Sequence, residues 1–184
     1  MLTYILLGIV VLIVLWLIVS FNRLVTLRNR AKEALSDIDV QSKRRFDLIP
    51  NLVETVKGYT DHEKSLLENV TNARAAVMQV KGSPIEKAKA EDQLSNTLKT
   101  LFAVAENYPQ LKANENFAKL QDELTDTEDK LQSARRFYNG TIRDLNTAIQ
   151  TFPTNLIAGM FGFSQMSFFE LGSDKERDPI KVSF

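Results

Sequence analysis

The chain has 184 residues, enough for one ordinary domain and a small additional segment. Its 23 basic and 23 acidic residues give a formal net charge of 0, which argues against nucleic acid as a partner and against an acidic tail acting by bulk charge. Cysteine is absent and there is one histidine, so disulfides, thiol nucleophiles, cysteine-ligated metals and mechanisms needing two imidazoles in one chain are excluded.

The first 21 residues form an uncharged apolar run. As a helix, this run rises about 32 Å, which matches a hydrocarbon core of about 30 Å. Tyr4 and Trp16 lie toward its two ends, where amphipathic rings suit a membrane interface. The alternatives are a buried core helix, unusual in so small a protein, and a signal peptide, which would need a basic start and a small-residue cleavage site. We therefore expect residues 1–21 to be a transmembrane anchor.

Basic residues gather just after this run. Residues 22–45 hold seven basic and three acidic side chains, a net charge of +4, whereas no basic residue precedes the run. The positive-inside rule predicts a single-pass protein with its N-terminus outside and the rest of the chain in the cytoplasm.

Residues 22–57 repeat apolar or small residues at helical spacing. The phase of the repeat holds across Pro50, which predicts a kink there rather than a turn, although proline removes one interior hydrogen bond. Gly58 is expected to end the helix in a left-handed conformation.

Two further helices are predicted from their end signals. Thr60 and Glu63 fit a capping box for a second helix, which Lys81 and Gly82 would close. The segment from Ser83 to Glu86 fits a second capping box, with Pro84 at the favoured first helical position. The third helix should then stop near Tyr108-Pro109.

A sevenfold repeat marks the fourth helix. An apolar or aromatic residue stands at every seventh position over five heptads, a pattern typical of a bundle or coiled coil. Four helices with short turns predict an all-α fold, in which an elongated antiparallel four-helix bundle occupies residues 22–153. The repeat comprises Phe117, Leu124, Leu131, Tyr138, Leu145 and Phe152, and Pro153 should end the helix.

Residues 154–184 differ from the rest because they hold five of the eleven phenylalanines. The start of this tail, residues 155–161, could form a short apolar helix. A disordered tail would not carry so much apolar surface, so we expect it to dock on the bundle, the membrane or another subunit. The candidate docking residues are Phe161, Phe163, Phe168 and Phe169.

Charged residues interrupt the apolar stripes. Arg45 continues the stripe of the first helix, and Glu128 and Arg135 lie seven residues apart beside the stripe of the fourth. Buried charges are costly unless paired, so these residues predict an inter-helix network that fixes register or, as a sharper hypothesis, a polar groove that recognises a partner. The candidate set is Arg45, Asp47, Glu128, Arg135, Tyr138 and Asn139.

Catalytic motifs are not evident. His62-Glu63 starts the zinc motif H-E-x-x-H, but its fifth position is Leu66, so a capping role for Glu63 and a solvent role for His62 are favoured. No G-x-S-x-G elbow or glycine-rich phosphate loop occurs. We expect no catalytic, metal or cofactor site, and no cofactor.

Nine segments in chain order form a further pattern: Asn22-x-Leu24-Val25, Ile38-Asp39-Val40-Gln41, Arg44-Arg45-x-Asp47-Leu48-Ile49-Pro50-Asn51-Leu52-Val53, Tyr59-x-x-His62-Glu63, Ala73-Arg74, Glu106-Asn107-Tyr108-Pro109-x-Leu111, Phe117-x-x-Leu120-Gln121, Ala134-Arg135-x-x-Tyr138-Asn139 and Phe152-Pro153. Taken together, these segments resemble the LemA family of membrane-anchored helical proteins.

The resemblance implies one transmembrane helix in a bacterial inner membrane and a cytoplasmic helical bundle, without a settled activity. Some relatives are associated with membrane-protease or envelope-stress systems, and one branch with magnetosome membranes. We therefore expect a non-enzymatic scaffold or adaptor that binds the bilayer and a membrane or cytoplasmic protein. The alternatives are a self-assembling homo-oligomer that organises the membrane and, less favoured, a metal-dependent hydrolase.

Overall fold

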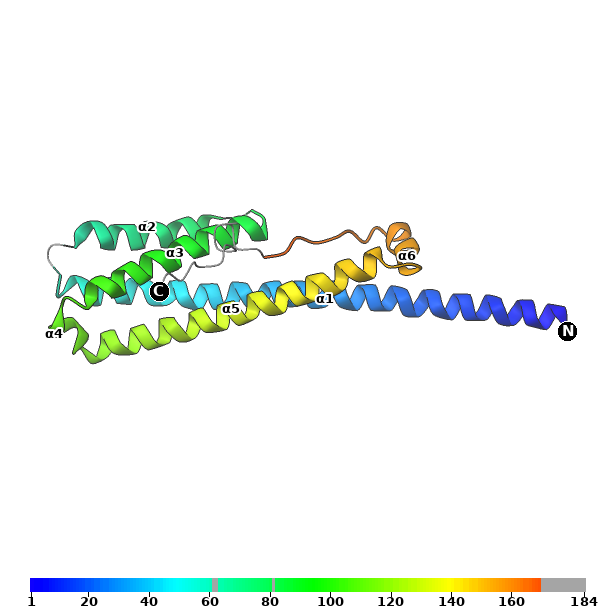
Figure 1. The fold of residues 1–184 in the computed structure, drawn as a ribbon, viewed down its shortest axis with the longest axis horizontal. Coiled ribbons are helices and arrows are strands. Elements are labelled where there is room, and N and C mark those ends of the chain that lie inside the picture. The colour runs from blue at the N-terminus through cyan, green and yellow to red at the C-terminus, as the bar shows by residue number, and fades with distance from the viewer. Residues whose placement is uncertain (61–62, 81, 170–184) are drawn as a thin grey trace, which may run out of the picture. The chain divides into compact units, whose positions relative to one another are not determined.

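A computed structural model describes residues 1–60, 63–80 and 82–169, and throughout this part the regular secondary structure is helical (Figure 1). The helices are α1 (Leu2–Lys57), α2 (Lys64–Gln79), α3 (Pro84–Ala105), α4 (Pro109–Lys112), α5 (Glu115–Gln150) and α6 (Thr154–Met160). The all-α prediction is therefore confirmed for the described residues. The described residues form two compact units: unit 1 comprises Met1–Asp39 and Gln132–Phe168, and unit 2 comprises those of Val40–Leu131 together with Phe169.

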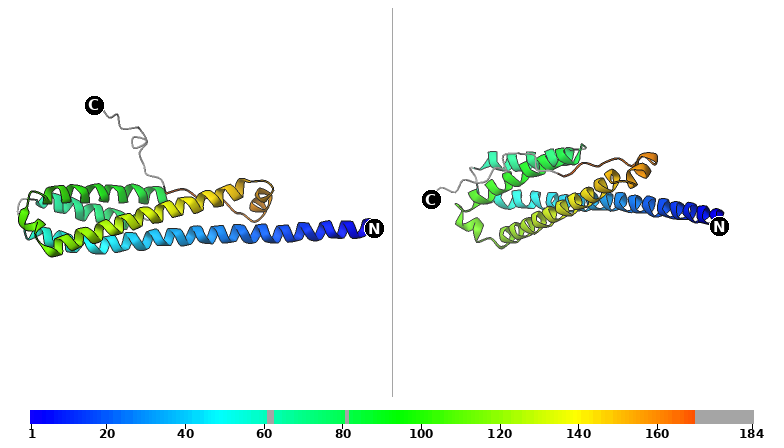
Figure 2. Two further views of the ribbon diagram at one scale, coloured as in Figure 1. Left: turned by 60° about the horizontal axis from the view of Figure 1, so that its bottom comes forward. Right: turned by 45° about the vertical axis from the view of Figure 1, so that its right-hand side comes forward.

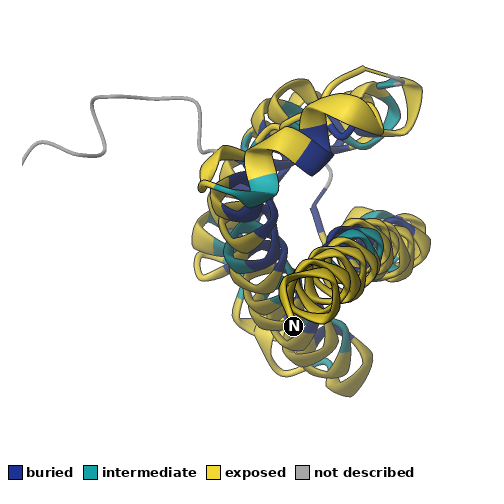
Figure 3. Ribbon diagram, turned by 90° about the vertical axis from the view of Figure 1, so that its right-hand side faces the viewer, coloured by how far each residue is buried: buried dark blue, intermediate teal, exposed yellow. Residues whose placement is uncertain are grey.

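α1 joins the expected anchor and the expected first helix into one continuous helix. Its N-terminal part is the one stretch of the described chain that is long and apolar enough to cross a membrane, and this stretch is fully exposed. Figure 3 shows it exposed on all sides at the end marked N. A helical stretch that is apolar all round and has no buried residue suits a hydrocarbon surrounding.

Pro50 does not end α1, because a neighbouring helix compensates for it. Proline has no backbone N–H, so the Phe46 carbonyl, four residues earlier, loses its usual helical donor. In unit 2 the Nε of Arg74, on α2, donates to this carbonyl at 2.9 Å. The helix therefore passes through Pro50 with the freed carbonyl satisfied.

The helix ends in the structure agree with those predicted from the sequence at one place and differ from them at two. The capping box of α3 is confirmed, since Ser83 and Glu86 exchange both hydrogen bonds and Pro84 opens the helix. The box predicted for α2 is wrong: the helix starts at Lys64, the Thr60 hydroxyl donates to the Val56 carbonyl, and Glu63 instead accepts from the Tyr108 hydroxyl at 3.1 Å.

The second difference concerns Gly58, which follows α1 without adopting a positive φ, so the left-handed cap predicted there is wrong. The chain instead continues in a tight turn, in which the Tyr59 N–H donates to the Val56 carbonyl. His62 and Lys81, for which the sequence predicts a solvent role and a helix-closing role, lie outside the described residues.

The core of unit 2 draws on five helices, since Leu111 of α4 also belongs to it. α2 and α3 lie side by side (Figure 2), and buried side chains from α1 and α5 join theirs in one apolar cluster. Burying large aliphatic side chains of this kind stabilises a fold by about 1.5–3 kcal/mol each. Members of the cluster are Ile49, Leu52, Val70, Val77, Leu94, Leu98, Leu101, Phe117 and Leu124.

Unit 1 has its own small core, which includes α6. Gly162 has a φ of 68°, and the Phe163 N–H donates to the Ala158 carbonyl at 2.9 Å, the pattern of a Schellman motif at the end of α6. Phe163 thereby turns inward and packs with Leu24 and Ile157.

The sevenfold stripe of α5 is buried from Phe117 to Leu145, but Phe152 lies beyond the helix end and is exposed, so its predicted core position is wrong.

Candidate functional site: a buried charge cluster

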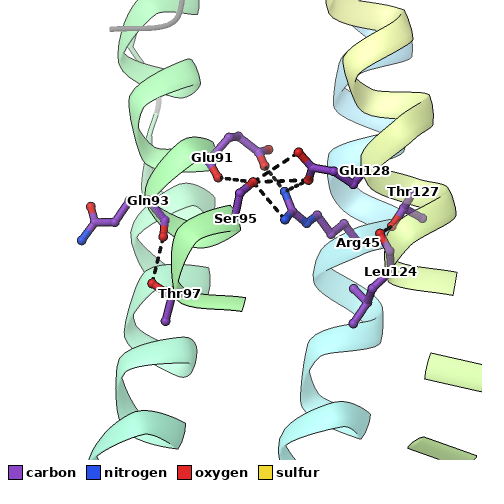
Figure 4. A network of polar contacts seen from close by, with 8 residues as sticks. All are labelled: Arg45, Glu91, Gln93, Ser95, Thr97, Leu124, Thr127 and Glu128. Atoms are coloured by element: carbon purple, nitrogen blue, oxygen red, sulfur yellow. Dashed lines mark hydrogen bonds and ion pairs between the residues drawn. The ribbon is translucent and has the colours of Figure 1, made fainter. Parts of the chain in front are cut away.

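Four polar side chains meet inside unit 2 (Figure 4). Arg45 of α1 places its Nη1 at 2.7 Å from Oε2 of Glu128 on α5 and at 3.6 Å from Oε2 of Glu91 on α3. The Nη2 of Arg45 donates to Oγ of Ser95, also on α3, at 3.0 Å. The Ser95 hydroxyl lies 3.2 Å from Oε2 of Glu128. We call these four residues the charge cluster.

Most of the charge cluster is buried. Side-chain exposure is 3% for Arg45 and 0% for Glu91, whereas Glu128 keeps 25%. One guanidinium faces two carboxylates, so the ionised cluster carries a net charge of −1. Removing ions from water costs several kcal/mol each, which the mutual attraction offsets only with good geometry and hydrogen bonds. We therefore expect the cluster to constrain how α1, α3 and α5 align more than it adds stability.

Two of the predicted site residues are thus brought together, and two members of the cluster were missed. Arg45 and Glu128 were predicted from their positions on the stripes. Glu91 and Ser95 were not, although both lie on the apolar face of α3 between Ala88 and Leu98. A polar residue at a core position of a helix is the signal that could have found them.

The other predicted polar residues lie elsewhere. Asp47 is exposed and pairs with Lys43 at 2.8 Å, so it takes no part in the cluster. Arg135, Tyr138 and Asn139 belong to unit 1, where Arg135 and Tyr138 are buried and Asn139 is half-buried. Burial raises the pKa of the Tyr138 phenol, whose hydroxyl donates to the Ser167 carbonyl at 3.0 Å.

The four predicted docking phenylalanines do not form one patch. Phe163 is buried in unit 1 and Phe169 in unit 2, whereas Phe161 is exposed and Phe168 is half-buried. The remainder of the expected tail domain, from residue 170, lies outside the described residues.

A polar groove of about 890 Å³ opens between α2 and α3 in unit 2. Amide and hydroxyl side chains dominate its lining, together with one lysine and one aspartate. Each amide offers both donors and an acceptor, so the groove can hydrogen-bond a polar chain in several ways. Its lining includes Asn69, Asn72, Lys89, Gln93, Asn96 and Thr97.

In the described part of the chain, no group of three or more histidine, cysteine or acidic side chains is placed to hold a metal ion. The hydroxyl in the charge cluster belongs to Ser95, and its neighbours are a guanidinium and carboxylates rather than an imidazole. The arrangement favours structural pairing of ions over nucleophilic chemistry.

Comparisons with known proteins agree on one family. The model of the LemA family matches residues 34–184. Protein LemA of Metamycoplasma hominis is 28% identical over 165 residues, which cover 88% of this chain and 74% of that protein. Magnetosome protein MamQ of Magnetospirillum gryphiswaldense is 25% identical, with 83% of this chain and 65% of that protein covered. Magnetosome protein MamQ 2 of Paramagnetospirillum magneticum is 24% identical, with 84% and 66% covered.

Proposed function

The chain belongs to the LemA family, and we propose that it is a membrane-tethered, non-enzymatic adaptor that presents the polar groove of α2 and α3 to a protein partner. The groove is the observation that carries the proposal, because it is a large, open surface lined mostly by side chains that can form hydrogen bonds. Tethering would raise the effective concentration of this groove at the membrane without any further contact.

The proposed arrangement places the N-terminus outside the bacterial inner membrane and the groove in the cytoplasm. The net charge of +4 in residues 22–45 supports this orientation. We further propose that α1, α2, α3 and α5 pack as an antiparallel four-helix bundle, supported by the mixed origin of the apolar cluster in unit 2. The partner is a membrane or cytoplasmic protein, for which membrane-protease and envelope-stress systems are the first candidates.

Site-specific photo-crosslinking in living cells tests the groove. A photoreactive residue at Asn96, in the groove, should give an adduct with a different protein, whereas one at the exposed Lys119 on α5 should not. Loss of the adduct when residues 1–21 are removed would show that the tether is required. Equal adducts at both positions would rule out the groove as the binding surface.

Self-assembly is the second candidate function. The MamQ relatives are named as magnetosome proteins, which associates them with a membrane-bounded compartment. A homo-oligomer that organises the membrane predicts that the Asn96 adduct contains a second copy of this chain. The mass of the adduct therefore distinguishes the two functions.

Orientation has a separate test. A protease added to intact spheroplasts should leave a C-terminal tag uncut and should remove it after lysis. Digestion of the tag before lysis would contradict the cytoplasmic placement but would leave the groove proposal open to the crosslinking result.

A further inference from the structure

Unit 1 carries apolar side chains that its core does not use. Phe152 follows α5, Leu156 and Met160 lie one turn apart on α6, and Phe161 ends that helix. Their exposed fractions are 75%, 60%, 75% and 55%, respectively. We call these four residues the α6 patch. Leu156 and Met160 are neighbours on one face of α6, and four large apolar side chains exposed within ten residues indicate a segment that contacts another apolar phase.

The α6 patch lies beside the residue at which the apolar run of α1 ends. The rings of Phe161 and Phe21 meet edge to face with centroids 4.8 Å apart, and Phe21 is the last residue before the polar flank. The apolar run of α1 and the end of α6 therefore touch at this contact.

Several contacts within unit 1 hold α6 in this position. Phe163, turned inward by the Schellman motif, packs edge to face on Phe21 with centroids 5.8 Å apart, and the Arg28 guanidinium lies 4.9 Å from its ring centre. The Asn146 carboxamide then exchanges two hydrogen bonds of 2.9 Å with the backbone N–H and carbonyl of Met166. The patch is thus exposed on a fixed element rather than on a free end.

The chemistry of the segment fits lipid. Between Asp144 and Glu170 there are 25 consecutive residues without a charged side chain, so the segment can enter an apolar phase without burying an ion. An isolated in-plane helix needs a basic face opposite its apolar face. α6 does not need one, because Ile157 and Ala158 on its other side are buried in the core of unit 1.

We propose that the α6 patch enters the interfacial layer of the same bilayer that holds residues 1–21, as a second membrane contact beside the anchor. This inference rests on the proposed membrane tether. A 21-residue helical span ends at the membrane interface. Phe21, and the Phe161 ring that contacts it, therefore lie at the depth of this interface. Side chains of the patch then reach about 5–10 Å into the boundary between head groups and acyl chains. Contacts at two points fix how unit 1 is oriented relative to the membrane plane.

Tryptophan quenching tests this placement, because the chain has one tryptophan, Trp16, inside the proposed span. The full chain is reconstituted in vesicles of phosphatidylcholine and phosphatidylglycerol whose acyl chains carry bromine near the carbonyl end. The probe is Met160→Trp in a Trp16→Phe background, and Leu156→Trp in that background is a second probe. The control is Phe137→Trp, also exposed on α5 but fifteen residues from Phe152, about 22 Å along a helix.

Bromine should quench the emission of both patch probes and leave that of the Phe137→Trp control unchanged, while unmodified Trp16 is quenched in the parent protein. Patch probes that behave like the control, with Trp16 quenched in the parent protein, would overturn the inference and leave the tether intact. Failure of Trp16 itself to be quenched would overturn both.

A blue shift of the probes that grows with protein concentration, without quenching by bromine, would assign the patch to a second copy of this chain and also overturn the inference. Each substituted position is exposed, so an unchanged helical far-ultraviolet circular dichroism spectrum is expected for every variant.

Discussion

The two compact units hold their chain segments together with different chemistry. In unit 2, α1, α3 and α5 meet through ions in an apolar interior, centred on Arg45 and Glu91. In unit 1, neutral hydrogen bonds hold the segment that follows α6: Tyr138 donates to the Ser167 carbonyl, and Asn146 bonds the backbone of Met166.

This difference determines what each contact can do. A buried ion is costly to leave unpaired, so the charge cluster penalises any alignment of the helices that separates its members. A neutral amide or phenol contributes about 0.5–1.5 kcal/mol per hydrogen bond and can exchange it for water near the surface. We therefore expect the unit 2 contacts to constrain helix register and the unit 1 contacts to position a short segment.

Removal of Arg45 should have the largest effect. Arg45→Met removes the guanidinium that pairs with the buried Glu91 and the part-buried Glu128, and we expect the free energy of unfolding to fall by about 3–5 kcal/mol. Urea unfolding of the full chain in detergent micelles, followed by circular dichroism, measures this loss. Arg44→Met is the matched control, because Arg44 is half exposed and lies 4.0 Å from Asp126.

A triple variant tests whether the charge cluster serves the specific alignment of the helices rather than the stability of the fold. Replacing the three ions together, as Arg45→Met with Glu91→Leu and Glu128→Leu, should restore most of the lost stability, because well-packed apolar side chains avoid the cost of burying ions. If Arg45→Met costs no more than Arg44→Met, the charge cluster does not carry the role given to it.

Arg74 should have the next largest effect, since its bond combines a charged donor with a backbone acceptor. Arg74→Met leaves the Phe46 carbonyl without the donor that replaces the missing N–H of Pro50, at a cost of about 1.5–3 kcal/mol. In a Pro50→Ala background the helix can form its own bond to this carbonyl, so the same substitution should cost less. A double-mutant cycle in urea measures the coupling, and equal costs in both backgrounds would contradict the compensation.

Asn146 provides the matching measurement in unit 1. Asn146→Ala removes two neutral bonds to Met166, and we expect a loss of about 1–2 kcal/mol. Hydrogen exchange of the Met166 amide should accelerate, whereas Gln165→Ala, an exposed neighbour on the same segment, should leave it unchanged. Unchanged protection in Asn146→Ala would show that other contacts hold this segment.

Local rules explain which parts of this structure the sequence predicts. The α3 capping box and the sevenfold stripe depend on neighbours within a few turns of one helix, and both follow from spacing. The donors to Phe46 and Met166 come from 28 and 20 residues away, so no periodicity reveals them. Thr60 and Glu63 have the residue types of a capping box, but in the structure the Glu63 carboxylate accepts a hydrogen bond from Tyr108, which is 45 residues away in the sequence. In the charge cluster, the stripes indicate that Arg45 is buried without identifying the helix that supplies its second carboxylate.

Substitution of Tyr138 should change the free energy of unfolding least, and the dependence of this change on pH allows it to be recognised. Tyr138→Phe removes the bond to the Ser167 carbonyl and should lower the free energy of unfolding by about 0.5–1.5 kcal/mol near neutral pH.

Burial raises the pKa of Tyr138 above its ordinary value of 10.0. Above pH 10.0 the unfolded chain therefore releases the phenolic proton while the folded chain retains it, so this residue's contribution to stability declines as the pH rises. Other groups titrate in the same range, so the quantity to measure is the difference in unfolding free energy between the parent protein and Tyr138→Phe. That difference should shrink, and can change sign, above pH 10.0, because the phenylalanine variant has no proton to lose. A difference that stays constant with pH would show that the folded protein does not retain this proton.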